Sequence, residues 1–267
     1  MVALQAELKA VKESLENIQK KVPSVLLPSS FLPALAREAE FWQKINIHRA
    51  DKILISATIA SEYIGEKETI IVDSGTTVDQ IPPILKENKP FVKVYTNNLL
   101  AAISVIPPTE KFRCILLSGE IDPIYGATYN IGKIDEPLKA IEANQIILAA
   151  TAISFEDGPM VQAVDRCNLQ FKRAMVQKAL QDPGSPRLII AVGWNKFQKA
   201  ISEDSNLNPV LDHREWNAVR KDKNFVLVAA KPPESIRTIE AERAREVIKT
   251  FIKNMEQGWM KIKICDI

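Results

Sequence analysis

An alternation of short apolar runs with longer amphipathic segments begins near residue 69 and limits the possible folds more than any other feature of the chain. The apolar runs predict strands at 69–73, 91–96, 112–118, 145–150, 187–192 and 224–229. The other segments predict helices at 77–87, 97–106, 133–142, 168–180 and 235–256, with one or two more between 41 and 64. Buried strands joined by helices favour a parallel sheet with helices on both faces, so an α/β fold is predicted.

The turn after the first predicted strand contains groups that bind anions. The apolar run 70–72 is followed by Asp-Ser-Gly-Thr-Thr at 73–77 and then by a predicted helix. Backbone N–H groups, hydroxyl groups and the partial positive charge of a helix N-terminus would meet there. Gly75 would let the backbone approach a ligand closely. The alternative is a capped strand-to-helix turn that holds no ligand.

Two more predicted strands also end in small polar residues. Thr96, Asn97 and Asn98 follow the second strand, and Ser118 and Gly119 follow the third. The carboxyl ends of parallel strands lie at one edge of a sheet, where ligands bind in open α/β folds. The sequence therefore predicts a ligand cleft at this edge.

Composition excludes several classes of protein. The 267 residues are 46% hydrophobic and 25% charged, and the net charge of +2 gives no electrostatic signature for DNA or an anionic membrane. The three cysteines are far apart and the two histidines, His48 and His213, lack partners at metal-ligand spacing. We predict no metal and no cofactor. The cysteine usage, and the absence of a signal peptide and of an 18-residue apolar run, favour a cytoplasmic protein.

Four segments are expected. Residues 1–22 carry a heptad seam, formed by Leu4, Leu8, Val11, Leu15, Ile18 and Val22. The seam predicts a coiled-coil-like helix and a homo-oligomer, although a helix lying on its own domain has the same stripe. A Pro-containing link at 23–41, the α/β domain at 42–232 and a helical extension at 233–267 follow.

The motifs together resemble a known family. Asp-Ser-Gly-Thr-Thr at 73–77 is followed by Tyr-Thr-Asn-Asn at 95–98, Leu-Ser-Gly-Glu at 117–120, Phe-Lys-Arg-Ala-Met at 171–175 and Asn-Lys-Phe at 195–197. This order resembles the C-terminal sensor domain of DeoR-type transcriptional repressors over about residues 42–200. The resemblance implies a three-layer α/β/α sandwich with a mostly parallel sheet, shared with ribose-5-phosphate isomerases and CoA transferases. It also implies binding of a phosphorylated sugar or related metabolite.

The resemblance implies roles for individual residues. The loop of Asp73, Ser74, Gly75, Thr76 and Thr77 would hold the phosphate or the sugar hydroxyls, and Asn97 would contact the ligand from the next loop. Gly119 would leave room for the ligand, while Lys172 and Lys196 would supply positive charge. The alternative for both lysines is a solvated surface charge.

The chain also departs from the family pattern. No acid is present at 149–153, Asn168 and Gln170 stand where acids are frequent, and Gly193 and Trp194 replace an expected Asp. Trp194 is a candidate wall of the pocket. The carboxylates that related isomerases use as bases are thus missing, which favours binding without turnover. The roughly 40 residues before the matched region show no recognition-helix pattern, so direct DNA binding is not expected.

The sequence favours a non-catalytic sensor for a small phosphorylated metabolite, either a sugar phosphate or a nucleotide. One alternative is an enzyme of the ribose-5-phosphate isomerase-like superfold, which needs a carboxylate facing the ligand. A second alternative is an oligomeric scaffold without a ligand, which an occluded cleft would indicate.

Overall fold

The computed structural model divides the chain into two compact units, residues 1–40 and 41–267. The structure describes residues 43–107, 109–122, 126–162, 165–182, 186–198, 206–222, 224–256 and 261–265, all in the second unit. The heptad segment 1–22 and the whole Pro-containing link at 23–41 lie outside the described residues.

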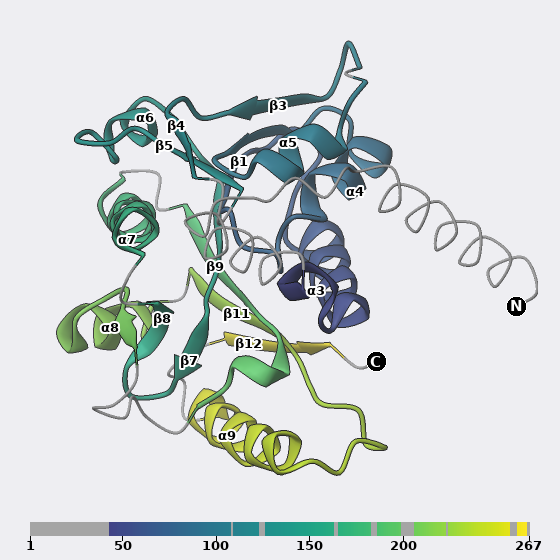
Figure 1. Cartoon of the computed structure of the whole chain (residues 1–267), viewed down its shortest axis with the longest axis vertical. Coiled ribbons are helices and arrows are strands. Elements are labelled where there is room, and N and C mark those ends of the chain that lie inside the picture. Colours follow the sequence, from purple (N-terminus) through teal and green to yellow (C-terminus); the bar gives the residue numbers. More distant parts are fainter. Residues whose placement is uncertain are drawn as a thin grey trace, which may run out of the picture. The chain divides into compact units, whose positions relative to one another are not determined.

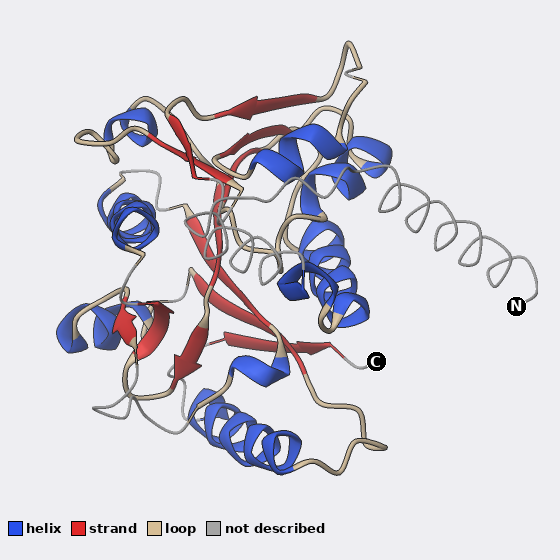
Figure 2. Cartoon of the chain, viewed as in Figure 1, coloured by secondary structure: helices blue, strands red, loops and turns tan. Residues whose placement is uncertain are grey.

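A seven-stranded sheet forms the centre of the domain (Figures 1 and 2). Its strands are β1 (Thr69–Val72), β2 (Lys93–Thr96), β3 (Arg113–Leu116), β6 (Gln145–Ala149), β9 (Arg187–Val192), β11 (Phe225–Ala230) and β12 (Lys261–Cys265). Their order is β12-β11-β9-β6-β1-β2-β3, and every neighbouring pair is parallel.

The strand order reverses direction at β1. From β1 the chain builds the sheet towards β2 and β3, and then returns to the other side of β1 with β6, β9, β11 and β12. The connections after β1 and β6 therefore leave the sheet in different directions. A crevice forms at such a switch point, beyond the carboxyl ends of the two strands.

Helices cover both faces of the sheet, as Figure 1 shows. On one face lie α3 (Arg49–Glu62), α4 (Ile81–Asn88) and α5 (Leu99–Ser104), whereas α6 (Glu136–Lys139), α7 (Arg166–Gln181), α8 (His213–Val219) and α9 (Ile239–Glu256) cover the other. Successive residues of a strand point to opposite faces, so Ile70 and Val72 join one core and Ile71 the other. The predicted three-layer α/β/α fold is confirmed.

Two small antiparallel sheets were not predicted. One is the hairpin of β4 (Glu120–Asp122) and β5 (Ala127–Tyr129), and the other contains β7 (Ala152–Ser154), β8 (Gly158–Gln162) and β10 (Leu207–Pro209). These segments lack the continuous apolar runs that mark the equally short central strands, and β8 and β10 each contain a proline, which is unfavourable within a strand.

The C-terminal segment contains more than the predicted helix. Helix α9 begins at Ile239, and β12 then adds a seventh strand parallel to β11. The sequence Lys-Ile-Lys-Ile-Cys alternates charged and apolar residues, as an edge strand does, but it is only five residues long. Within the described residues, no helix combines the length and the apolar character that crossing a membrane requires.

Gly75 allows the loop after β1 to pass closely over the end of β6. A Cβ atom at position 75 would overlap with the Cβ atom of Ala149. We expect Gly75→Ala to lower the free energy of unfolding by about 1–3 kcal/mol, because the added methyl group overpacks this crossing. Denaturant unfolding measures the loss.

The double variant Gly75→Ala/Ala149→Gly is the control, since it removes the methyl group that the new side chain would meet. It should be more stable than Gly75→Ala alone. A double variant at least as unstable as the single one would contradict the close approach.

Candidate functional site

A cavity of about 150 Å³ lies at the switch point, beyond the carboxyl ends of β1, β6 and β9. Its wall comes from five stretches of chain: Lys44 to Lys52 at the start of α3, Ser74–Thr77 after β1, Ala149–Thr151 after β6, Asp165 to Lys172 at the start of α7, and Gly193 to Lys196 around η2 (Trp194–Lys196). The strand order thus explains why residues so far apart in the sequence share one cavity.

The loop after β1 supplies backbone donors. The N–H groups of Ser74, Gly75, Thr76 and Thr77 make no hydrogen bond to any other described residue. The next amide, that of Val78, donates to the carbonyl oxygen of Gly75 at 3.1 Å and closes the turn. Successive free N–H groups in a turn form a concave anion site.

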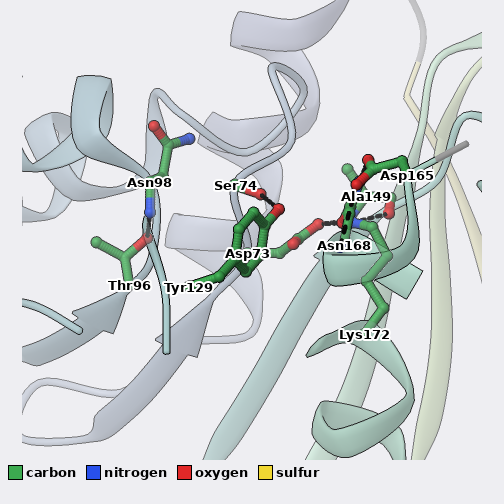
Figure 3. Close-up of polar contacts among 9 residues, drawn as sticks. All are labelled: Asp73, Ser74, Thr96, Asn98, Tyr129, Ala149, Asp165, Asn168 and Lys172. Atoms are coloured by element: carbon green, nitrogen blue, oxygen red, sulfur yellow. Dashed lines mark hydrogen bonds and ion pairs between the residues drawn. The ribbon is translucent and has the colours of Figure 1, made fainter. Parts of the chain in front are cut away.

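Asp73 lies directly behind this loop in a buried ion pair with Lys172 (Figure 3). Asp73 is fully buried and Lys172 is 3% exposed. The Oδ2 atom of Asp73 also accepts a hydrogen bond from the N–H group of Ala149 at 3.1 Å, and the Lys172 ammonium donates to the Ala149 carbonyl at 2.8 Å. The Asp73 carboxylate, the Ala149 backbone and the Lys172 ammonium group together join the ends of β1 and β6 to α7.

Two other lysines give the cavity positive charge. Lys196 lies on η2, and burial, followed by repulsion from Lys44, lowers the pKa of its ammonium group. Among the described residues it has no acid partner. Lys52, in α3, donates to the carbonyl oxygens of Lys44 and Ile45, and burial lowers its pKa to about 8.

The start of α7 brings an acid and an amide to the cavity. Asp165 caps the helix, because its Oδ1 atom accepts from the N–H group of Asn168 at 3.1 Å. Its Oδ2 atom accepts from the side-chain Nδ2 of the same residue at 2.6 Å (Figure 3). Burial raises the pKa of this carboxyl group. Both oxygens are therefore engaged within the helix cap.

The start of α3 contributes Asp51 and His48. Burial raises the pKa of the Asp51 carboxyl group and lowers that of the His48 imidazole. The His48 ring packs edge-on against Trp194, with ring centroids 4.7 Å apart. His48 holds a left-handed backbone conformation with φ at 53° as it begins the helix. This segment closes the cavity on the side of α3.

Six of the nine predicted site residues line the cavity: Ser74, Gly75, Thr76, Thr77, Lys172 and Lys196. Asp73 lies behind them, whereas Asn97 and Gly119 do not reach the lining. The hairpin of β4 and β5 explains this, because Thr128 donates from its N–H to the Asn97 carbonyl at 2.9 Å and Gly119 packs against the backbone of Tyr129. The hairpin fills the space where the sequence predicts the cleft to continue.

The sequence did not point to Asp51, Lys52 or His48 as site residues, and it offered Asp165 only as a carboxylate that an enzyme would need. The sequence does contain a signal for Asp51. It lies four residues before Ile55 and eight before Ile59, so it falls on the same buried face of helix α3. A charged residue in an apolar stripe needs a partner or a cavity. Within the described residues, no three His, Cys, Asp or Glu side chains are grouped to hold a metal ion.

The switch-point cavity and the covered parallel sheet define an α/β ligand-binding domain. The family model described as the DeoR C terminal sensor domain matches residues 47–192. The chain belongs to this family, as its motifs predict. No curated protein matches its sequence.

Several solved structures have a similar fold. They include eIF2B delta from Chaetomium thermophilum, at 14% identity and a TM-score of 0.42, with 63% of this chain and 55% of that chain covered. Ribose 5-phosphate isomerase A from Methanocaldococcus jannaschii has 11% identity and a TM-score of 0.35, with coverage of 57% and 56%. Ribose 5-phosphate isomerase from Plasmodium falciparum has 15% identity and a TM-score of 0.36, with coverage of 55% and 52%. The chain thus spans little more than half of each.

We expect the buried ion pair to show strong energetic coupling. Asp73→Asn and Lys172→Met should each lower the free energy of unfolding by about 3–5 kcal/mol, because each leaves one buried charge without its partner. The double variant should lose much less than the sum of the two. Denaturant unfolding of all four proteins measures the coupling.

The exposed pair of Lys133 and Glu136, 3.2 Å apart, offers a matched control. Lys133→Met should change stability by less than about 1 kcal/mol, because solvent screens this pair. Additive losses at Asp73 and Lys172 would contradict the interpretation of the buried pair.

Proposed function

We propose that this domain is a non-catalytic sensor that binds a small phosphorylated metabolite in the switch-point cavity. One observation carries the proposal. The four N–H groups at 74–77 have no hydrogen bond to another described residue, and the ammonium group of Lys196 in the same cavity has no acid partner in the described part of the chain. Backbone donors and an ammonium group together suit a phosphate group. Membership of the sensor family supports a small-molecule effector.

The charges around the cavity favour an anion. Four lysines, Lys44, Lys52, Lys172 and Lys196, face two acids, Asp51 and Asp165. The Lys172 charge is neutralised by Asp73, which leaves an excess of positive charge on the wall. Burial makes this excess more effective, because water screens it less than at an open surface.

The state of two carboxylates at the cavity, those of Asp73 and Asp165, supports binding without turnover, whereas one oxygen of the third, Asp51, has no hydrogen bond of normal geometry to a described residue. Asp73 is held in its ion pair, and Asp165 accepts two hydrogen bonds from Asn168. A general base must be within reach of the proton that it removes and free to take it. The heptad seam at 1–22 supports the further proposal that the domain signals as a homo-oligomer.

Inorganic phosphate and ribose 5-phosphate should both raise the melting temperature, because a ligand that binds only the folded state stabilises it. Lys196→Gln should weaken the binding of both by roughly tenfold, since it removes one unpaired charge from the cavity. Differential scanning fluorimetry and calorimetric titration measure the two effects.

Lys133→Gln removes an exposed lysine elsewhere and should bind like the wild type. The proposal fails if no phosphate compound binds, or if the two lysine variants bind equally well.

Anion binding should weaken as the pH rises through the pKa of Lys52, which is about 8. Its ammonium group loses its charge between about pH 7 and pH 9, and the attraction for an anion falls with it. Sulfate is the suitable probe, because its own charge is constant over this range. Its affinity should fall by roughly tenfold over the interval.

Lys52→Met should bind sulfate weakly at the lower pH and lose most of the pH dependence. The same slope in the wild type and in this variant would exclude Lys52 as the titrating group.

A further inference from the structure

Strand β3 is the last strand on one side of the central sheet, and no described strand pairs with its outer edge (Figure 1). Directly after β3, the N–H group of Leu117 donates to the carbonyl oxygen of Thr96 in β2 at 2.8 Å. Every second residue of a strand bonds to a given neighbour, so Cys114 and Leu116 direct their backbone groups away from β2. Their N–H and C=O groups have no hydrogen bond to another described residue.

The outer edge of β3 lacks the features that keep exposed strands from pairing. Lysines, prolines and bulges commonly protect such edges. At the opposite end of the sheet, β12 carries Lys261 and Lys263 between its apolar residues. The sequence of β3 is Arg-Cys-Ile-Leu, with a single charge and no proline. An open apolar edge of this kind is a template for another strand.

Exposed apolar side chains surround β3. Helix α5 packs against the strand and carries Ile103, Ile106 lies between α5 and β3, and Ile121 follows in β4. Phe91 lies beneath the Lys111 ammonium group, which is 5.5 Å from the centre of the ring. The four apolar side chains are each at least 51% exposed. Single exposed apolar residues are ordinary, but a group around one open strand indicates a contact surface.

A second copy of β3 supplies partners for the free backbone groups of the first. Two copies that run antiparallel about a twofold axis through Ile115 place Cys114 of each opposite Leu116 of the other. Residues that form a hydrogen-bonded antiparallel pair exchange both their N–H and their C=O groups. This register therefore bonds all four free groups of each copy.

The charges that flank β3 favour the antiparallel arrangement. The start of the strand carries Lys111 and Arg113 against one acid, Glu110, whereas the acid Glu120 follows its end. A twofold axis brings the start of one copy beside the end of the other, so opposite charges approach. A parallel arrangement would place the two basic ends together.

From these observations we propose that β3 is a self-association surface through which two copies of this chain pair antiparallel and join their central sheets. The contact buries the apolar side chains around β3, and its twofold symmetry closes it at two copies. It is separate from the heptad seam at 1–22 and does not depend on what the cavity binds.

A charge at the twofold axis tests the proposal. The side chain of Ile115 is half-buried and belongs to neither hydrophobic core, so the fold should tolerate Ile115→Lys. This variant places two like charges opposite each other and should weaken self-association by at least roughly tenfold. Ile239→Lys changes an exposed isoleucine at the start of α9 and should associate like the wild type. Analytical ultracentrifugation of the full chain measures both.

A mixing experiment separates a lost contact from a damaged fold. Ile115→Glu should also associate weakly with itself, for the same reason as Ile115→Lys. An equimolar mixture of the two variants should regain the association, because opposite charges then face each other across the axis. Damage to the individual chains would not be repaired by mixing them.

A disulfide reports the predicted register. Ile115→Cys should form a covalent dimer on mild oxidation, because a directly opposed, non-hydrogen-bonded pair brings the two Cβ atoms close together. Burial raises the pKa of the neighbouring Cys114 thiol to about 11, which keeps it protonated and slow to react. Ile239→Cys has the same native cysteines and should not form the dimer.

The measurements decide the proposal together. Equal masses of the wild type and Ile115→Lys at every concentration, or no regained association in the mixture, would overturn it. Any association through the heptad seam is common to all variants and does not affect the comparison. If the charged variants do not fold, the cross-link decides, and its absence in Ile115→Cys would overturn the proposal.

Discussion

The buried contact between Asp73, Lys172 and the backbone of Ala149 is the interaction on which the rest of the site depends. Separating two charges from water is costly unless each is paired and hydrogen-bonded, and here the backbone of Ala149 bonds to both. The contact holds the ends of β1 and β6 beside the start of α7. It also occupies the Lys172 ammonium group, so Lys196 and Lys52, which line the cavity, are the cations that we propose face a ligand.

The order of strands in the sheet places the contact between Asp73, Lys172 and Ala149 at the switch point between β1 and β6. Because the chain leaves β1 towards β2 and returns on the other side with β6, the two loops diverge and open a cavity between them. Gly75 keeps the loop after β1 close to Ala149, and the amides at 74–77 remain free of hydrogen bonds to described residues. One arrangement of strands thereby determines both the close crossing at Gly75 and the position of the amides that we propose bind an anion.

The sequence predicts the sheet well and the cavity only in part. Strand β9 has the predicted bounds, 187–192, because β-branched runs signal buried strands locally. The order of strands is not local, so the sequence did not indicate that the cavity opens towards β6 and β9 rather than β2 and β3. Asn97 and Gly119 were predicted at the ligand for that reason, and Asp51 was missed because its helix precedes the recognised motifs.

The most direct measurement is the position of a bound anion in crystals soaked with selenate, located by the anomalous scattering of selenium. The account predicts a single strong peak within hydrogen-bond distance of the amides at 74–77 and close to the Lys196 ammonium group. Crystals that bind selenate elsewhere, or that leave this loop empty at a saturating concentration, would contradict it.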